Sequence, residues 1–162
     1  MTHGLRPARP GDEAVIMELV GALARYEKLD RAVESRPEDI AAALFAANPK
    51  VFCDLAEVGG TVVGFALWFY TFSTFRGRHG IYLEDLFVRP EARRAGAGKA
   101  LLRNLARRCV DEGLGRFEWS VLDWNEPAIA FYAAQSARLL AGWSMCRIDG
   151  PALAALAAEA RS

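Results

Sequence analysis

Apolar positions along the chain follow two different periods. From residue 15 to residue 23 they recur at spacings of three and four, which is typical of one face of an α-helix. Segments such as 61–71 are instead rich in β-branched and aromatic residues, which is typical of strands. The predicted helices are one that opens after Pro10-Gly11-Asp12 and ends near Tyr26, and others over 36–46, 96–112, 126–135 and 151–160. The predicted strands cover 4–9, 51–57, 61–71, 81–88, 116–122 and 143–149.

The order of these elements predicts the fold class. The pair Gly59-Gly60 between two strand segments is a hairpin signature, whereas the long helix over 96–112 is a crossover between strands. Hairpins mixed with helical crossovers predict an α+β (mixed α/β) fold and exclude an all-parallel, doubly wound sheet. Repeats and low-complexity linkers are absent from the sequence, so we expect a single domain over residues 1–162.

Charge changes the picture because it is unevenly distributed. Twenty basic residues balance twenty acidic ones in the 162-residue chain, so the average gives no indication of a nucleic-acid or anionic-membrane binder. The segment 89–108, however, has seven bases against one acid (net +6), whereas 1–88 and 109–162 are each net −3. A neutral protein with one basic segment predicts a local site for an anion.

The few cysteines and histidines exclude other chemistry. Cys53, Cys109 and Cys146 are odd in number and far apart, which excludes a disulfide framework and a zinc-finger pattern. With only His3 and His79, neither a transition-metal site nor a Ser-His-Asp set is expected. The sequence contains no apolar run of about 18 residues and no signal-peptide pattern. We therefore expect no metal, no membrane contact and a cytoplasmic location.

The segment 87–101 combines the features of an anion site. A strand ends at Pro90, and a loop rich in Arg and Gly leads directly into the long helix. The first turn of a helix has unpaired N–H groups and the positive end of the helix dipole, and both attract anions. Neither a Walker A loop nor a GxGxxG fingerprint fits, because Ala100 and Leu101 replace residues that those motifs require.

The pattern that does fit is R/Q-x-x-G-x-G/A, in residues 93–98. It is preceded by the strand 82–88 (YLEDLFV) and followed by WNEPAIAFY at 124–132. With LARYE at 23–27, this arrangement resembles the GNAT superfamily of N-acetyltransferases, in particular its spermidine/spermine (diamine) branch, over roughly residues 4–150. The resemblance implies a central mixed, mostly antiparallel sheet flanked by helices, with a splayed strand pair at the cofactor cleft. It also implies acetyl transfer from acetyl-CoA to a primary amine by direct attack in a ternary complex.

The resemblance also assigns residues to the cofactor. The backbone of the strand before the loop pairs with the pantetheine arm in that family, and the loop and helix start hold the pyrophosphate. The expected cofactor-binding residues are Leu86, Phe87, Val88, Arg93, Arg94, Ala95, Gly96, Ala97, Gly98, Lys99, Asn125, Glu126, Pro127 and Ala128.

The same resemblance implies roles in the reaction. Tyr132 matches the general acid that protonates the CoA sulfur, and Glu84 matches the carboxylate that relays the substrate proton through water. Because Glu84 and Asp85 are adjacent in a strand, we expect their side chains to face opposite sides of the sheet. The residues expected to bind the amine are Tyr26, Glu27, Glu84, Asp85, Glu118, Trp119 and Ser120.

Departures from the family pattern leave the amine open. Ser73 and Phe75 occupy positions where polyamine enzymes tend to have an acid and Trp, and Ala141 replaces another expected acid. Ser136 stands where the family has Gly. A diamine, a polyamine or a lysine-like amine therefore remains possible, in a homodimer as is common for relatives. The alternatives are a regulatory module that binds acetyl-CoA without turnover and an acetyltransferase of protein lysines or N-termini.

Overall fold

The computed structural model describes residues 4–159. The chain divides into two compact units, Met1–Leu122 and Asp123–Ser162. The first contains the whole sheet, whose strands lie in the order β1 (Gly4–Pro7), β2 (Phe52–Val58), β3 (Thr61–Ser73), β4 (Arg78–Val88) and β5 (Phe117–Trp119). The first four are antiparallel neighbours, whereas β5 lies parallel to β4. The predicted mixed, mostly antiparallel sheet is therefore confirmed.

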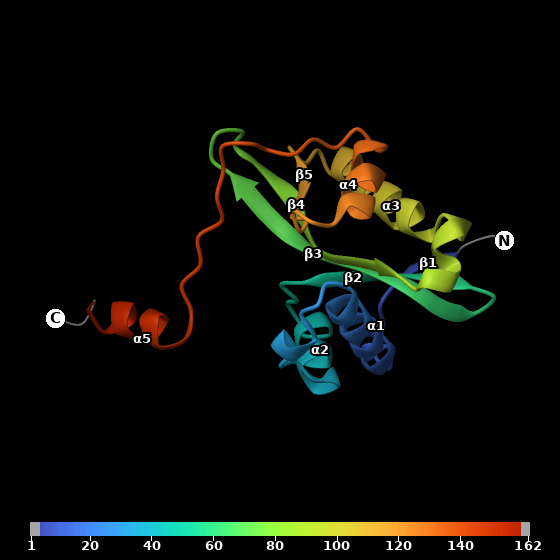
Figure 1. Cartoon of the computed structure of the whole chain (residues 1–162), viewed down its shortest axis with the longest axis horizontal. Coiled ribbons are helices and arrows are strands. Elements are labelled where there is room, and N and C mark those ends of the chain that lie inside the picture. Colours follow the sequence, from blue (N-terminus) through green and yellow to red (C-terminus); the bar gives the residue numbers. More distant parts are fainter. Residues whose placement is uncertain (1–3, 160–162) are drawn as a thin grey trace. The chain divides into compact units, whose positions relative to one another are not determined.

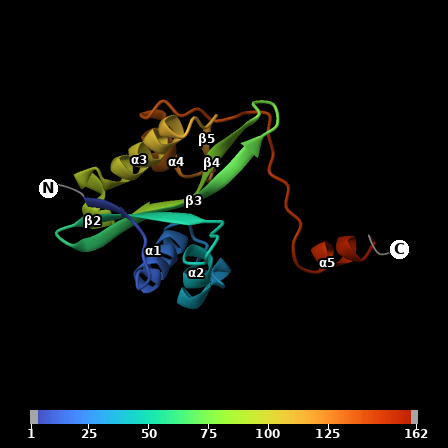
Figure 2. The ribbon, with the colours of Figure 1, turned by 180° about the vertical axis from the view of Figure 1, so that it is seen from behind.

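Helices cover both faces of this sheet (Figures 1 and 2). α1 (Glu13–Tyr26) and α2 (Pro37–Leu44) lie against one face, with the short 3-10 helix η1 (Asp30–Ala32) between them in the chain. Ile16 and Leu19 of α1 pack with Leu55 and Phe65 of the sheet in a core from which water is excluded. α3 (Ala97–Asp111) covers the other face with a row that includes the buried Leu101 and Leu105, as its three- and four-residue spacing predicts.

The long β3–β4 pair contains one irregularity that decides the geometry of the site. Leu67 pairs with Asp85 but the next residue, Trp68, pairs with Leu83. Glu84 is therefore the extra residue of a β-bulge, and the alternation of faces restarts there. Tyr82 and Glu84 face the α1 side by alternation, and Asp85 faces it with its partner Leu67. The expectation that Glu84 and Asp85 point to opposite faces is wrong, because it assumed an unbroken strand.

The strands β4 and β5 part soon after they meet. Their pairing covers only Ile81, Tyr82 and Leu83 of β4. From Glu84 to Val88, β4 has no partner strand on that side among the described residues. One row of backbone N–H and C=O groups is thereby left open, and these groups require partners of some kind. This is the splayed pair that the resemblance implied.

The second unit has two helices and no strand among its described residues. α4 (Glu126–Ala133) matches the predicted helix, and α5 (Gly150–Glu159) matches the last one up to residue 159, residue 160 being outside the described range. The predicted strand over 143–149 is wrong, because this segment has no regular secondary structure. Its alternation suits a strand, but within its own unit no strand can pair with its backbone groups.

Candidate active site at the bulge of β4

The start of α3 is built to receive an anion. β4 leads through Arg89 into η2 (Pro90–Ala95), and Gly96 then turns the chain with a φ of 81° before α3 begins at Ala97. No side chain among the described residues caps this helix. The N–H groups of its first turn therefore remain available, and together with the helix dipole they attract a phosphate. Ala97, Gly98 and Lys99 occupy this turn, as expected of pyrophosphate ligands.

Arg93 serves this loop differently from what its charge suggested. Its Nε donates a hydrogen bond to the backbone oxygen of Val88 at 3.0 Å. Its guanidinium carbon lies 5.0 Å from the ring centroid of Tyr26 and 5.5 Å from that of Phe87. Two aromatic rings and a carbonyl thus hold the side chain that was expected to bind phosphate. The backbones of Arg94 and Ala95 lie in η2, and the side chain of Arg94 is outside the described part of the structure.

Most of the basic segment 89–108 lies away from this loop. Arg89 pairs with Glu18 of α1 at 2.9 Å, and Arg108 pairs with Glu112 at 2.9 Å while lying over the ring of Trp68. Arg103 and Arg107 are exposed on the outer side of α3. The net charge of +6 therefore located the right segment, but backbone geometry contributes more to the anion site than these side chains do.

The open edge of β4 offers a second feature for a cofactor. The side chains of Phe87 and Val88 are buried, and Phe87 belongs to the core cluster with Ile16 and Leu19. Leu86 is half-buried. Only the backbone of these three residues is therefore presented along the edge, which is the mode in which an extended ligand adds to a sheet as a further strand.

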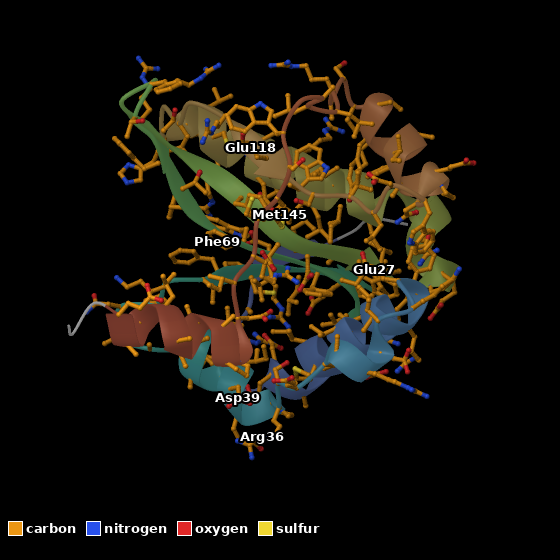
Figure 3. The ribbon with its side chains drawn as sticks, turned by 60° about the vertical axis from the view of Figure 1, so that its left-hand side comes forward. Glu27, Arg36, Asp39, Phe69, Glu118 and Met145 are labelled. Atoms are coloured by element: carbon orange, nitrogen blue, oxygen red, sulfur yellow. The ribbon has the colours of Figure 1, made fainter. Side chains whose placement is uncertain are left out.

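Three carboxylates gather where this edge begins. Asp85 is half-buried on the α1 side, and Glu84 is exposed beside it. Glu27 follows α1, at the helix end that approaches β4. Burial, followed by the nearby charges of Glu84 and Glu27, raises the pKa of Asp85 to about 6. Burial also raises the pKa of Glu27. Figure 3 labels Glu27 among the side chains.

The three carboxylates have no counter-ion of their own. No lysine, arginine or histidine among the described side chains forms an ion pair with them. Nor does the described part of the chain contain a group of three or more acidic, histidine or cysteine side chains placed to hold a metal ion. Carboxylates that repel each other and are partly desolvated gain stability when a cation enters. The site therefore suits an organic cation such as an ammonium group.

β5 extends this face beyond the bulge. Glu118 is paired with Tyr82, whose hydroxyl lies 2.6 Å from Oγ of Ser120. Phe69 of β3 contacts the Tyr82 ring, with centroids 5.3 Å apart. Trp119 pairs with Leu83 on the opposite face, so it is separated from Glu118 and Ser120. The sequence reasoning missed Phe69 and Tyr82, although their alternation with buried neighbours could have placed them on one face.

The residues expected from the second unit have local structure of their own. Oδ1 of Asn125 accepts a hydrogen bond from the N–H of Ala128 at 3.3 Å and so caps α4, which begins with Glu126 and Pro127. Tyr132 is half-buried near the end of α4, beside the ring of Phe131. Ser136 has a φ of 64°. It therefore adopts the left-handed turn for which the family uses Gly, at a modest cost in strain.

The substrate-side departures also have places in the structure. Ser73 is buried, and its Oγ accepts a hydrogen bond from the N–H of Arg76 in the β3–β4 turn at 3.3 Å. Phe75 lies in the same turn and is fully exposed. Ala141 lies in the irregular part of the second unit. The turn over 74–77 is shorter than the predicted loop over 73–80, because β3 and β4 pair as far as Ser73 and Arg78.

Comparisons with known proteins agree with this geometry. The Acetyltransferase (GNAT) family matches residues 16–136. A thialysine N-epsilon-acetyltransferase of Sus scrofa is 36% identical over 96% of this chain and 97% of its own length. L-ornithine N5-acetyltransferase NATA1 of Arabidopsis thaliana is 44% identical over 59% of this chain and 42% of its own. The solved structure of an integron cassette protein, VCH_CASS6 from V. cholerae, has a TM-score of 0.76, with 28% identity over 97% of this chain and 98% of that one.

The chain therefore belongs to the GNAT family of acetyltransferases. It is an acetyl-CoA-dependent N-acetyltransferase, as its motifs predicted. In the described residues no helix is long and apolar enough to cross a membrane.

Proposed function

We propose that this enzyme acetylates the terminal primary amine of a short substrate with two amino groups, such as a diamine or a lysine-like amine. The observation that carries the proposal is the group of three carboxylates, Glu27, Glu84 and Asp85, which lacks a counter-ion among the described side chains. Relatives whose names specify thialysine and ornithine support it, because both compounds have an amine at the end of a short chain.

Acetyl-CoA supplies the acetyl group, and the chain positions it. The N–H groups at the start of α3 receive the pyrophosphate, and the open edge of β4 pairs with the extended pantetheine arm. The open N–H groups of that edge then polarise the thioester carbonyl as its oxygen becomes negative. We assign these contacts to Leu86, Phe87 and Val88 and to residues 93–99, with Asn125, Glu126, Pro127 and Ala128 on the far side of the cofactor.

Two proton transfers accompany the transfer of the acetyl group. The substrate ammonium has no free electron pair, so it must lose a proton, which passes through water to Glu84. The free amine attacks the thioester carbon, the new C–N bond forms, and the C–S bond breaks. The thiolate takes a proton from the hydroxyl of Tyr132, and the protonated amide loses its extra proton to water. Tyr26, Glu27 and Asp85 hold the cationic substrate in place, with Glu118, Trp119 and Ser120 at the end of the sheet.

An amine panel with detection of released CoA thiol tests the proposal. We expect turnover with short diamines and diamino acids and much less with monoamines of equal length. Asp85→Asn should raise KM for the amine and leave KM for acetyl-CoA nearly unchanged, because Asp85 faces α1 rather than the open edge. Asp111→Asn, at the exposed end of α3, is the matched control. Equal turnover of monoamines and diamines, or equal effects of the two variants, would contradict the proposal.

We also propose that the active form is a homodimer. Large apolar side chains of the second unit, including Leu139, Trp143 and Met145, are between two thirds and nine tenths exposed. Apolar surface of this kind is typical of an interface with another chain. Light scattering on the purified protein measures the mass directly, and a mass equal to that of one chain would reject this proposal.

A reducing compartment, and hence the cytoplasm, is the third proposal. Cys53, Cys109 and Cys146 are all free thiols, and the first two are buried. Free thiols are typical of proteins in a reducing environment. Fluorescence microscopy of the tagged protein in its own cells tests the location, and a signal confined to an oxidising compartment would reject it.

A further inference from the structure

Charged side chains follow one another in a definite order along the α1 face of β4 and β5. Arg78 and Arg116 lie near the β3–β4 turn, Glu118 follows Arg116 on β5, and the carboxylates of Glu84, Asp85 and Glu27 lie beyond. The order is thus cationic, then anionic, then strongly anionic. A ligand complementary to this order has a carboxylate, then an ammonium group next to it, then a second ammonium group at the far end.

We propose that the substrate is an α-amino acid with a terminal side-chain amine, whose amino-acid end binds to Arg116 and Glu118. This inference rests on the proposed function, and it narrows the amine to one class. Arg116 takes the α-carboxylate, Glu118 takes the α-ammonium, and the side-chain amine reaches the group of three carboxylates where acetylation occurs.

The fold holds Arg116 in place on this face. Gly80 of β4 lies next to Arg116, and a Cβ atom added at Gly80 would lie 3.0 Å from Cγ of Arg116 and 2.7 Å from its backbone oxygen. The aliphatic part of Arg116 therefore occupies space that only glycine leaves free. Its Nε lies 2.9 Å from Oε2 of Glu118, and the two side chains are 38% and 31% exposed. The guanidinium is positioned and still accessible to a ligand.

Glu118 is framed by polar and aromatic groups on the same face. Its partner Tyr82 shares a short hydrogen bond with Ser120 and contacts the ring of Phe69. Figure 3 labels Phe69 and Glu118, which come from β3 and β5. Aromatic rings beside a carboxylate are favourable for an ammonium group, because their faces are negative. The surroundings of Glu118 therefore suit an α-ammonium group better than an apolar chain.

The spacing along the sheet agrees with a short diamino acid. Glu118 lies at the level of Tyr82, which is two residues before Glu84. Two residues along a strand and one step between strands separate the Cα atoms of Glu118 and Glu84 by about 8 Å. The α-carbon and the terminal nitrogen of an extended four- or five-bond side chain are roughly 5–6 Å apart. Side chains that lean toward the ligand span the remaining distance.

A simple surface ion pair is the competing explanation for Arg116 and Glu118. Exposed pairs contribute little to stability, about 0–1 kcal/mol, so this explanation predicts no effect on substrate choice. Three compounds separate the two explanations. Ornithine has both groups at its amino-acid end, putrescine is the same chain without the carboxylate, and 5-aminopentanoate is the same chain without the α-amino group.

The experiment measures kcat/KM for the three compounds in wild type and in Arg116→Gln and Glu118→Gln. We expect wild type to favour ornithine over each analogue by about tenfold or more, because a site built for a polar group rejects a compound that lacks it. Arg116→Gln should lower the ornithine-to-putrescine ratio about tenfold. Glu118→Gln should instead lower the ornithine-to-5-aminopentanoate ratio. Arg103→Gln, on the exposed side of α3, is the control and should change neither ratio.

The outcomes separate this inference from the proposed function. If putrescine and ornithine react equally well in wild type, the amino-acid specificity is wrong while diamine acetylation stands. If both ratios are unchanged in the variants, Arg116 and Glu118 are a surface ion pair and the inference is overturned. If no compound with two amino groups reacts, the proposed function itself fails. The wild-type preferences need no variant, and Arg116→Lys replaces Arg116→Gln if the latter does not fold.

Discussion

The guanidinium carbon of Arg93 lies 5.0 Å from the ring centroid of Tyr26, so the loop before α3 is joined to the end of α1. Tyr26 is the last residue of that helix, and Glu27 follows it. The same guanidinium lies against Phe87, and its Nε is bonded to the carbonyl of Val88 on β4. One side chain therefore connects the anion site, the open strand edge and the carboxylates proposed to bind the amine.

This contact predicts that Arg93 acts through its shape rather than its charge. Arg93→Gln should raise KM for both acetyl-CoA and the amine several-fold, since a cation–π contact and a hydrogen bond are each worth about 1 kcal/mol. Arg93→Lys should be nearly as impaired, because an ammonium group cannot stack flat on two rings. Steady-state kinetics with each substrate varied measures this. Full recovery in the lysine variant would show that Arg93 only supplies charge to a phosphate.

Asp85 predicts a pH dependence of stability. Its pKa is about 6 in the folded protein against an ordinary value of 3.8, so the folded state binds more protons between these two values. The free energy of unfolding contributed by this group therefore falls as pH rises from about 4 to 6, by about 3 kcal/mol in total. Asp85→Asn removes the penalty. Urea unfolding should show the variant to be more stable than wild type at pH 8 and no more stable at pH 4.

A bound cation should reverse this penalty. At pH 8, a saturating diamine should stabilise wild type more than it stabilises Asp85→Asn, because the ammonium pairs with the ionised carboxylate. Thermal melts with and without the amine measure both values. An equal gain in the two proteins would show that Asp85 does not face the amine.

Gly96 predicts a specific loss at the anion site. Its φ of 81° lies in the left-handed region, where a Cβ atom costs about 1–2 kcal/mol. Gly96→Ala should therefore weaken acetyl-CoA binding about tenfold by shifting the first turn of α3. Gly98→Ala, inside the same helix, is the matched comparison and should weaken binding less. Calorimetric titration with CoA gives both affinities, and the opposite order would contradict this account of the turn.

Tyr132 predicts an effect on turnover without an effect on binding. Tyr132→Phe keeps the ring beside Phe131 but removes the proton that we assign to the departing thiolate. We expect kcat to fall by about 100-fold or more, which is typical when a general acid is lost, while the affinity for acetyl-CoA remains. The comparison is Phe131→Leu, which keeps the hydroxyl. Wild-type kcat in Tyr132→Phe would remove Tyr132 from the mechanism.

Trp68 predicts a cost in stability that is separate from catalysis. Its Nε1 donates a hydrogen bond to the buried Asp54 at 3.0 Å, and its ring lies 5.0 Å from the guanidinium carbon of Arg108. Trp68→Phe leaves the carboxylate without this donor, which should lower the free energy of unfolding by about 2–3 kcal/mol. Trp143→Phe, at an exposed position, should change it by less than about 0.5 kcal/mol. Urea unfolding compares the two.

Local patterns in the sequence were enough for most of the elements and for the anion site. The helices over 37–44, 97–111 and 126–133 lie within the predicted ranges, because helix periodicity, proline and glycine act over a few residues. The strand–loop–helix motif around Gly96 is equally local, since every N–H that forms the anion site belongs to one turn. The strand predicted over 143–149 failed because a strand depends on a partner that its own residues do not specify.

The sequence by itself therefore determined the family, the fold class, the reaction and the cofactor loop. Tertiary structure decided which side chains share a face. The pairing of Leu67 with Asp85 and of Trp68 with Leu83 creates the bulge that brings Glu84 and Asp85 together, and the short β4–β5 ladder places Glu118 beside Tyr82. The physical reason is that register between strands is set by the packing of the whole sheet against its helices. Residues adjacent in the chain do not contain that information.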